Sequence, residues 1–146
     1  MILNMVINKM ENIEDNINTL ELLKRHLDEL EREMEYLNLN MQEHARAKET
    51  LQTLLKTSEN NLLISIGANT YIFCNKSDYK NAITSIGSNV FTENKYETAI
   101  ELLEQRIKDI TVINSQLQEE YIKSRDQYLA LSDRVDKYYK SVQKKD

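Results

Sequence analysis

The stretch Ser65-Ile66-Gly67-Ala68-Asn69 recurs as Ser85-Ile86-Gly87-Ser88-Asn89, and these two segments hold both glycines of the chain. Apolar, β-branched and aromatic residues flank the first copy, as Leu62-Leu63-Ile64 and Thr70-Tyr71-Ile72-Phe73, and similar residues flank the second. A strand, a glycine-containing turn and a second strand form the pattern of a β-hairpin. Glycine and asparagine tolerate the positive φ angles of such turns. The segment 58–95 therefore predicts two β-hairpins in tandem.

Residues 10–57, which precede the hairpins, predict one long helix. Its apolar residues return at steps of three and four, the spacing of a coiled-coil seam: Met10, Ile13, Ile17, Leu20, Leu23, Leu27, Leu30, Met34, Leu37, Met41, Leu51 and Leu55. The frame slips between Ile17 and Leu27, and such a stammer locally overwinds a coiled coil. His44 and Lys48 occupy seam positions near the end of this helix, where packing is expected to become less regular.

Residues 96–143 predict a second helix whose seam keeps a single register: Ile100, Leu103, Ile107, Ile110, Asn114, Leu117, Tyr121, Ser124, Tyr128, Leu131, Val135, Tyr138 and Val142. A polar side chain at a seam position, here Asn114, fixes the register at some loss of stability. The first helix is mainly acidic over residues 11–35, and the second is mainly basic over residues 134–145. An antiparallel pairing brings these segments together, so the charges favour that orientation.

These elements predict an α+β chain with a long antiparallel two-helix coiled coil and two tandem β-hairpins between the helices. Isolated hairpins are marginal in water and leave strand edges open. We therefore expect the hairpins of several chains to join an oligomeric β-barrel body. The expected parts are an N-terminal tail at 1–9, a helix at 10–57, hairpins at 58–95, a helix at 96–143 and a tail at 144–146.

Composition excludes several classes of protein. The 146 residues include no proline and only two glycines, too few turn formers for a sandwich, a barrel or a wound α/β sheet built from this chain alone. The net charge of −5 makes nucleic acid an unexpected partner. No apolar run reaches the roughly 18 residues of a membrane span. The single cysteine, Cys74, excludes an internal disulfide and favours a reducing, cytoplasmic location.

Catalytic patterns are absent from the sequence. No nucleophile has a histidine and an acid as plausible partners, and no glycine-rich phosphate loop or metal-ligand spacing occurs. We therefore expect no enzyme activity, no metal and no cofactor.

The organisation resembles the alpha-type subunits of the prefoldin family. Three features carry the resemblance: the stretch Ala45-Arg46-Ala47-Lys48-Glu49-Thr50-Leu51, the doubled Ile66-Gly67-Ala68 and Ile86-Gly87-Ser88 turns, and the stretch Ala99-Ile100-Glu101-Leu102-Leu103-Glu104-Gln105-Arg106-Ile107. Two hairpins indicate the alpha type, because beta-type subunits have one. The family often has proline where Ser65 stands and glycine where Asn69 and Asn89 stand, and both differences are compatible with the turns.

The resemblance implies a hexamer of two alpha-type and four beta-type subunits, with a β-barrel body and six projecting coiled coils. It also implies an ATP-independent chaperone that captures unfolded client proteins at the coiled-coil tips and passes them to a group II chaperonin. The apolar opening Met1-Ile-Leu-Asn-Met-Val6 is unusual for the family, and Met5 and Met10 are alternative starts.

Frayed coiled-coil ends expose seam residues, so the predicted client-binding tip comprises residues 1–20 and 131–146. Its candidate contact residues are Ile2, Leu3, Met5, Val6, Ile7, Met10, Ile13, Ile17, Val135, Tyr138, Tyr139 and Val142. Methionine and tyrosine suit adaptable apolar contact. The candidate assembly residues in the hairpins are Ile64, Ile66, Ile72, Ile83, Ile86 and Val90.

Other interpretations of these residues remain open. Ile13, Ile17, Val135, Tyr138 and Val142 also fit an ordinary coiled-coil core. A structural adaptor that joins fixed partners is the alternative function, and an RNA-binding helical arm is a weaker one because the first helix is acidic.

Overall fold

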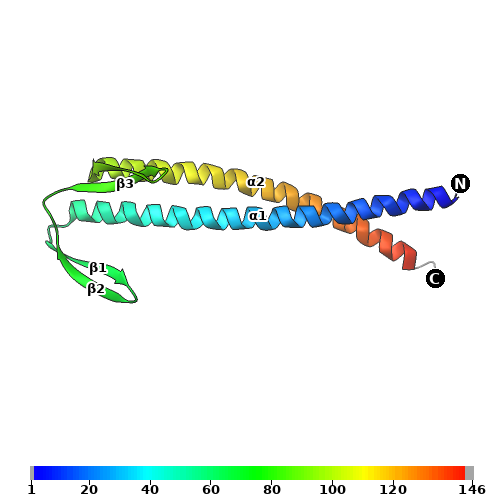
Figure 1. The fold of residues 1–146 in the computed structure, drawn as a ribbon, viewed down its shortest axis with the longest axis horizontal. Helices are drawn as coiled ribbons and strands as arrows, with labels where there is room; N and C mark the ends of the chain where they lie inside the picture. Colours follow the sequence, from blue (N-terminus) through cyan, green and yellow to red (C-terminus); the bar gives the residue numbers. More distant parts are fainter. Residues whose placement is uncertain (1, 144–146) are drawn as a thin grey trace. The chain divides into compact units, whose positions relative to one another are not determined.

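A computed structural model describes the backbone of residues 2–143 and the side chains of residues 12–143. The elements follow in the order α1 (Ile2–Lys56), β1 (Asn61–Gly67), β2 (Thr70–Asn75), β3 (Asn81–Gly87), β4 (Val90–Lys95) and α2 (Tyr96–Gln143) (Figure 1). The predicted α+β class, with two long helices and two hairpins between them, is confirmed. The chain divides into a helical unit, Met1–Leu39 with Thr111–Asp146, and a hairpin unit, Asn40–Ile110.

The first helix begins earlier than the sequence pattern indicates. Helix α1 starts at Ile2 rather than at residue 10, so residues 2–9, expected as a tail, are helical. No proline or glycine interrupts this segment, and a helix continues past the end of its packed seam when nothing breaks it. The other ends of the two helices lie within one residue of their expected positions.

The helical unit is an antiparallel helix pair joined along the predicted seam. Leu30 of α1 is 5% exposed and Val135 of α2 is 8% exposed. The remaining seam residues from Ile13 to Leu37 and from Asn114 to Tyr138 are buried or half-buried. Ser124 is also buried in this seam, where its small side chain leaves room for the facing helix.

Polar contacts also join the two helices within the helical unit. Asn114 Nδ2 donates a hydrogen bond of 3.0 Å to Asn38 Oδ1, and the Tyr121 hydroxyl donates one of 2.6 Å to Glu31. This hydrogen bond to the Glu31 carboxylate raises the pKa of Tyr121. Asn114 Oδ1 is buried and has no hydrogen-bond partner within the described part of the chain. Asn114 therefore makes a polar contact between the helices at the predicted seam position, and its effect on register and stability stays a prediction.

The hairpin unit contains the inner ends of both helices and the two hairpins. Ala99 is fully buried and Leu103 is 8% exposed, so the start of α2 forms the centre of this unit's small core. Lys48 of α1 forms an ion pair of 3.5 Å with Glu104 of α2. Lys76, which follows β2, donates a hydrogen bond of 2.7 Å to the carbonyl oxygen of Thr57. This cation satisfies an orphan carbonyl just beyond the end of α1.

Both hairpins use the same turn. Strand β1 pairs antiparallel with β2, and β3 pairs in the same way with β4, in two separate two-stranded sheets. The loop residues Ala68 and Asn69 have φ angles of 48° and 55°, and their counterparts Ser88 and Asn89 have 48° and 59°. Positive φ at both loop residues is the geometry of a type I′ turn. A bulge precedes each turn, and Gly67 takes a φ of 98° there.

Substitutions at Gly67 and Ala68 in the first turn should have different effects on the free energy of unfolding. Gly67→Ala is expected to lower the free energy of unfolding by about 1–2 kcal/mol, because an L side chain at this positive φ is strained. Ala68→Gly should change it by less than about 0.5 kcal/mol, because relief of strain offsets the greater freedom of the unfolded chain. Urea unfolding followed by circular dichroism measures both. Equal losses for the two variants would show that the turn does not have this conformation.

Candidate functional site

The seam of the helical unit opens toward the start of α1 and the end of α2. Val135 is 8% exposed, whereas Val142, two helical turns further along the same seam, is 48% exposed. Tyr139, which flanks the seam, is 49% exposed. Seam side chains that are covered elsewhere in this unit are therefore accessible at its end.

An open groove of about 380 Å³ lies at this end and is lined by both helices. We call it the tip groove, defined by Ile13, Glu14, Ile17, Tyr138, Tyr139 and Val142. The rings of Tyr138 and Tyr139 meet edge to face, with centroids 5.9 Å apart and planes at 73°. Such a pair gives a large apolar contact area with polar hydroxyls at its edge.

Five of the predicted tip residues lie together in the tip groove, and a sixth is buried elsewhere in the seam. Ile13, Ile17, Tyr138, Tyr139 and Val142 line the tip groove. Val135 is buried in the seam, so its side chain is part of the coiled-coil core rather than a contact surface. The side chains of Ile2, Leu3, Met5, Val6, Ile7 and Met10 lie outside the described residues.

The first hairpin is apolar on both faces. Ile64 is paired with Ile72, and side chains alternate along a strand, so Leu62, Ile64, Ile66 and Ile72 share one face. Leu63 is paired with Phe73 and Ser65 with Tyr71 on the other face. Leu63, Tyr71 and Phe73 are 59%, 55% and 84% exposed. Ile64, Ile66 and Ile72 on the first face are 44%, 60% and 43% exposed, so residues 12–143 leave most of both faces uncovered.

The second hairpin divides its predicted residues between two faces. Ile86 and Val90 lie on the face that also carries Thr84 and Thr92. Ile83 is paired with Glu93, so it lies on the opposite face, and it is 76% exposed. The six predicted assembly residues are thus all exposed, but they do not form one surface.

Four residues at the tip groove and in the first hairpin are not among those predicted from the sequence: Glu14, Leu63, Tyr71 and Phe73. Leu63, Tyr71 and Phe73 belong to the continuous apolar runs Leu62-Leu63-Ile64 and Tyr71-Ile72-Phe73. Such runs signal a strand with two apolar faces, so the signal was present. Glu14 has no such signal, because only the pairing of the helices places it beside Tyr138 and Tyr139.

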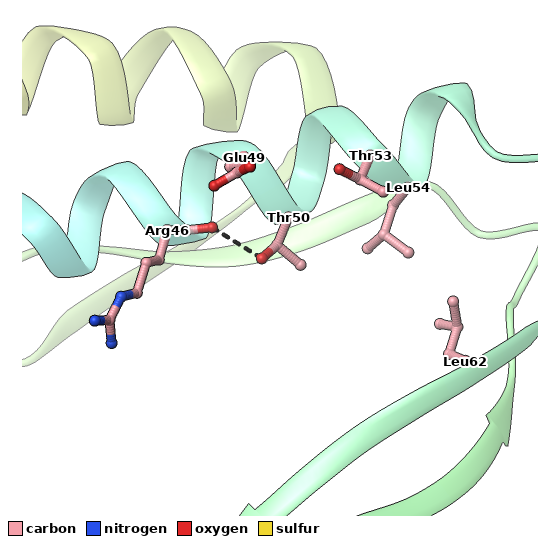
Figure 2. A pocket seen from close by; sticks show the side chains of 6 residues that line it. All are labelled: Arg46, Glu49, Thr50, Thr53, Leu54 and Leu62. Atoms are coloured by element: carbon pink, nitrogen blue, oxygen red, sulfur yellow. Dashed lines mark hydrogen bonds between the residues drawn. The ribbon is translucent and has the colours of Figure 1, made fainter.

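A second groove, of about 460 Å³, lies in the hairpin unit between α1 and β1. Figure 2 shows Leu54 of α1 and Leu62 of β1 directed toward each other, with Arg46 and Glu49 further along the helix. Thr50 donates a hydrogen bond of 2.8 Å to the Arg46 carbonyl oxygen, so its hydroxyl is satisfied within α1. The face of the first hairpin that carries Leu62 therefore borders this groove, which the described residues do not fill.

A polar cluster anchors the segment between the hairpins. The Tyr79 hydroxyl donates a hydrogen bond to Glu93, and Asn81 Nδ2 donates one of 3.0 Å to the same carboxylate oxygen. The bond to Glu93 raises the pKa of Tyr79, and the same two bonds lower the pKa of Glu93. These contacts explain Glu93 as a structural carboxylate of the second hairpin.

Among the described residues, no group of three or more histidine, cysteine, aspartate or glutamate side chains is placed to hold a metal ion. Within the same residues, neither helix has an apolar stretch long enough to cross a membrane.

Comparison with known proteins agrees with this architecture. The family profile described as Prefoldin subunit matches residues 23–141, most of the chain. The prefoldin subunit alpha of Nitrosopumilus maritimus is 31% identical over 70% of this chain and 70% of its own length. The prefoldin subunit alpha 1 of Thermococcus kodakarensis is 34% identical over 61% of this chain and 62% of its own length, slightly less than two thirds of that relative.

One solved structure that is similar is the filamentous prefoldin of Methanocaldococcus jannaschii. The alignment covers 85% of this chain and 98% of the chain in that structure, with 19% sequence identity and a TM-score of 0.49. The family assignment rests on the sequence matches. The chain therefore belongs to the prefoldin family, as a subunit of the alpha type.

Proposed function

We propose that the chain is a subunit of an ATP-independent chaperone that holds unfolded proteins at the tip groove and passes them to a group II chaperonin. The observation that carries the proposal is the open end of the seam, where Tyr139 and Val142 are about half exposed beside Ile13 and Ile17. Unfolded chains expose apolar side chains, and an accessible apolar groove gives them somewhere to bury that surface.

The proposed assembly is a cytoplasmic hexamer of two alpha-type and four beta-type subunits. Its support in this chain is the hairpin surface: the first hairpin exposes apolar side chains on both faces, and all four strands have an open edge. Exposed edges and apolar faces of this kind are normally covered in the native assembly. Other prefoldin subunits would cover them by joining their strands into a closed β-barrel.

The test is a pair of matched double substitutions in the assembled complex. Tyr139→Ser with Val142→Ser removes the two most exposed apolar side chains of the tip groove. Tyr36→Ser with Leu129→Ser is the control, because these side chains are 64% and 57% exposed on the helices but do not line the groove. The readout is suppression of aggregation of a denatured test protein.

The groove variant is expected to lose most of its holding activity and to keep its mass, and the control should keep both. Equal activity in the two variants would reject the tip groove as the binding site. Loss of one folded partner, with holding of unfolded proteins unchanged, would instead favour the adaptor function.

A further inference from the structure

Glu14 is the one charged side chain among the residues that line the tip groove. It is exposed, and no ion pair to it is formed by residues 12–143. The rest of the lining is apolar or aromatic. The groove thus combines two tyrosine rings with a carboxylate that forms no ion pair with any residue from 12 to 143.

Within residues 12–143, the two lysines nearest the end of α2 form no ion pair with this carboxylate. Lys137 is bonded to Asp133 of its own helix at 2.5 Å. Lys140 lies two residues from each of the seam residues Tyr138 and Val142. Residues two apart lie on different faces of a helix, so Lys140 points away from the seam. Neither lysine lines the groove.

From this geometry we propose that the tip groove prefers unfolded segments in which a lysine or arginine stands next to a bulky apolar residue. The proposal rests on the proposed function, because it names the kind of segment that the groove would hold. The cation would lie beside the Glu14 carboxylate and against the Tyr138 or Tyr139 ring, where both attract positive charge. The apolar neighbour would lie against Ile13, Ile17 and Val142.

The size of the groove admits such a pair of side chains. An apolar cavity of about 150 Å³ is enough for one benzene ring, and the tip groove is about 380 Å³. Lysine and arginine can lay their aliphatic stems on apolar surface while keeping the charge in water, so the open rim suits them. A segment with an acidic residue beside the apolar one would place like charges together at Glu14.

The test uses the assembled complex and three short fluorescein-labelled peptides that differ only in carrying Phe–Arg, Phe–Gln or Phe–Glu pairs. Fluorescence anisotropy at one fixed ionic strength gives their affinities. The Phe–Arg peptide should bind about fivefold more tightly than the Phe–Gln peptide, and the Phe–Glu peptide should bind most weakly. Glu14→Gln should remove this preference and Glu14→Lys should reverse it. Asp15→Asn, the matched loss of a carboxylate outside the groove, should retain it.

The outcomes separate this proposal from the proposed function. Equal affinity for the three peptides, with binding abolished by Tyr139→Ser and Val142→Ser, would overturn the charge preference and leave capture at the groove intact. A preference that persists in Glu14→Gln would also overturn it. Absence of peptide binding, or binding insensitive to Tyr139→Ser and Val142→Ser, would overturn both. Tip-to-tip association of two copies, seen as a mass increase that the same substitutions abolish, would assign the groove to a second chain and overturn both.

Discussion

Replacing Ile66 and Ile86 by aspartate is expected to release the chain from its assembly as monomers or small aggregates. Both isoleucines are exposed in this chain, at 60% and 52%. If other subunits cover them, each stabilises the assembly by about 1.5–3 kcal/mol through burial. An aspartate at the same place would instead bury an unpaired charge, at a loss of several kcal/mol. Size-exclusion chromatography with light scattering measures the mass.

The matched control for this variant is Ile113→Asp with Ile122→Asp. These isoleucines are 44% and 42% exposed on α2, and they belong to the helical unit rather than to the hairpin unit. The control complex should keep its native mass. If the hairpin variant also keeps its mass, the hairpins do not hold the assembly together.

Leu30→Ala is expected to lower the stability of the helical unit by about 2–5 kcal/mol, because it removes buried methyl groups and leaves a cavity in the seam. Leu30 is 5% exposed, the lowest value for a leucine of this seam. Leu39→Ala is the control on the same helix, since Leu39 is 56% exposed and should change stability by no more than about 0.5 kcal/mol. Thermal unfolding by circular dichroism distinguishes them, and similar losses would contradict the burial of this seam.

The sequence predicts the elements well where local chemistry decides them. The repeated turns around Gly67 and Gly87 predict both hairpins because positive φ restricts which residues can stand there. The two seams predict which faces of the helices are buried, and Asn114 stands where its polarity indicates. These features depend on residues near one another in the chain or on a strict period.

Features that depend on pairing between segments are predicted less well. The sequence predicts one assembly role for Ile83 and Ile86, yet the register of β3 with β4 places their side chains on opposite faces of the second hairpin. The seam pattern predicts the same contact role for Val135 and Val142. Their exposures differ, at 8% and 48%, because α1 covers the seam at Val135 but not at Val142. Glu14 is an ordinary surface acid in the sequence and becomes part of a groove only when α1 lies beside α2.

The native mass and composition of the complex that contains this chain are the decisive measurement for the proposed assembly. The chain would be recovered from its own cells by a tag on the C-terminus, under conditions that preserve assemblies. The expected complex contains two copies of this chain and four copies of a smaller coiled-coil subunit. A monomer, or a complex with one unrelated folded protein, would contradict the proposed assembly.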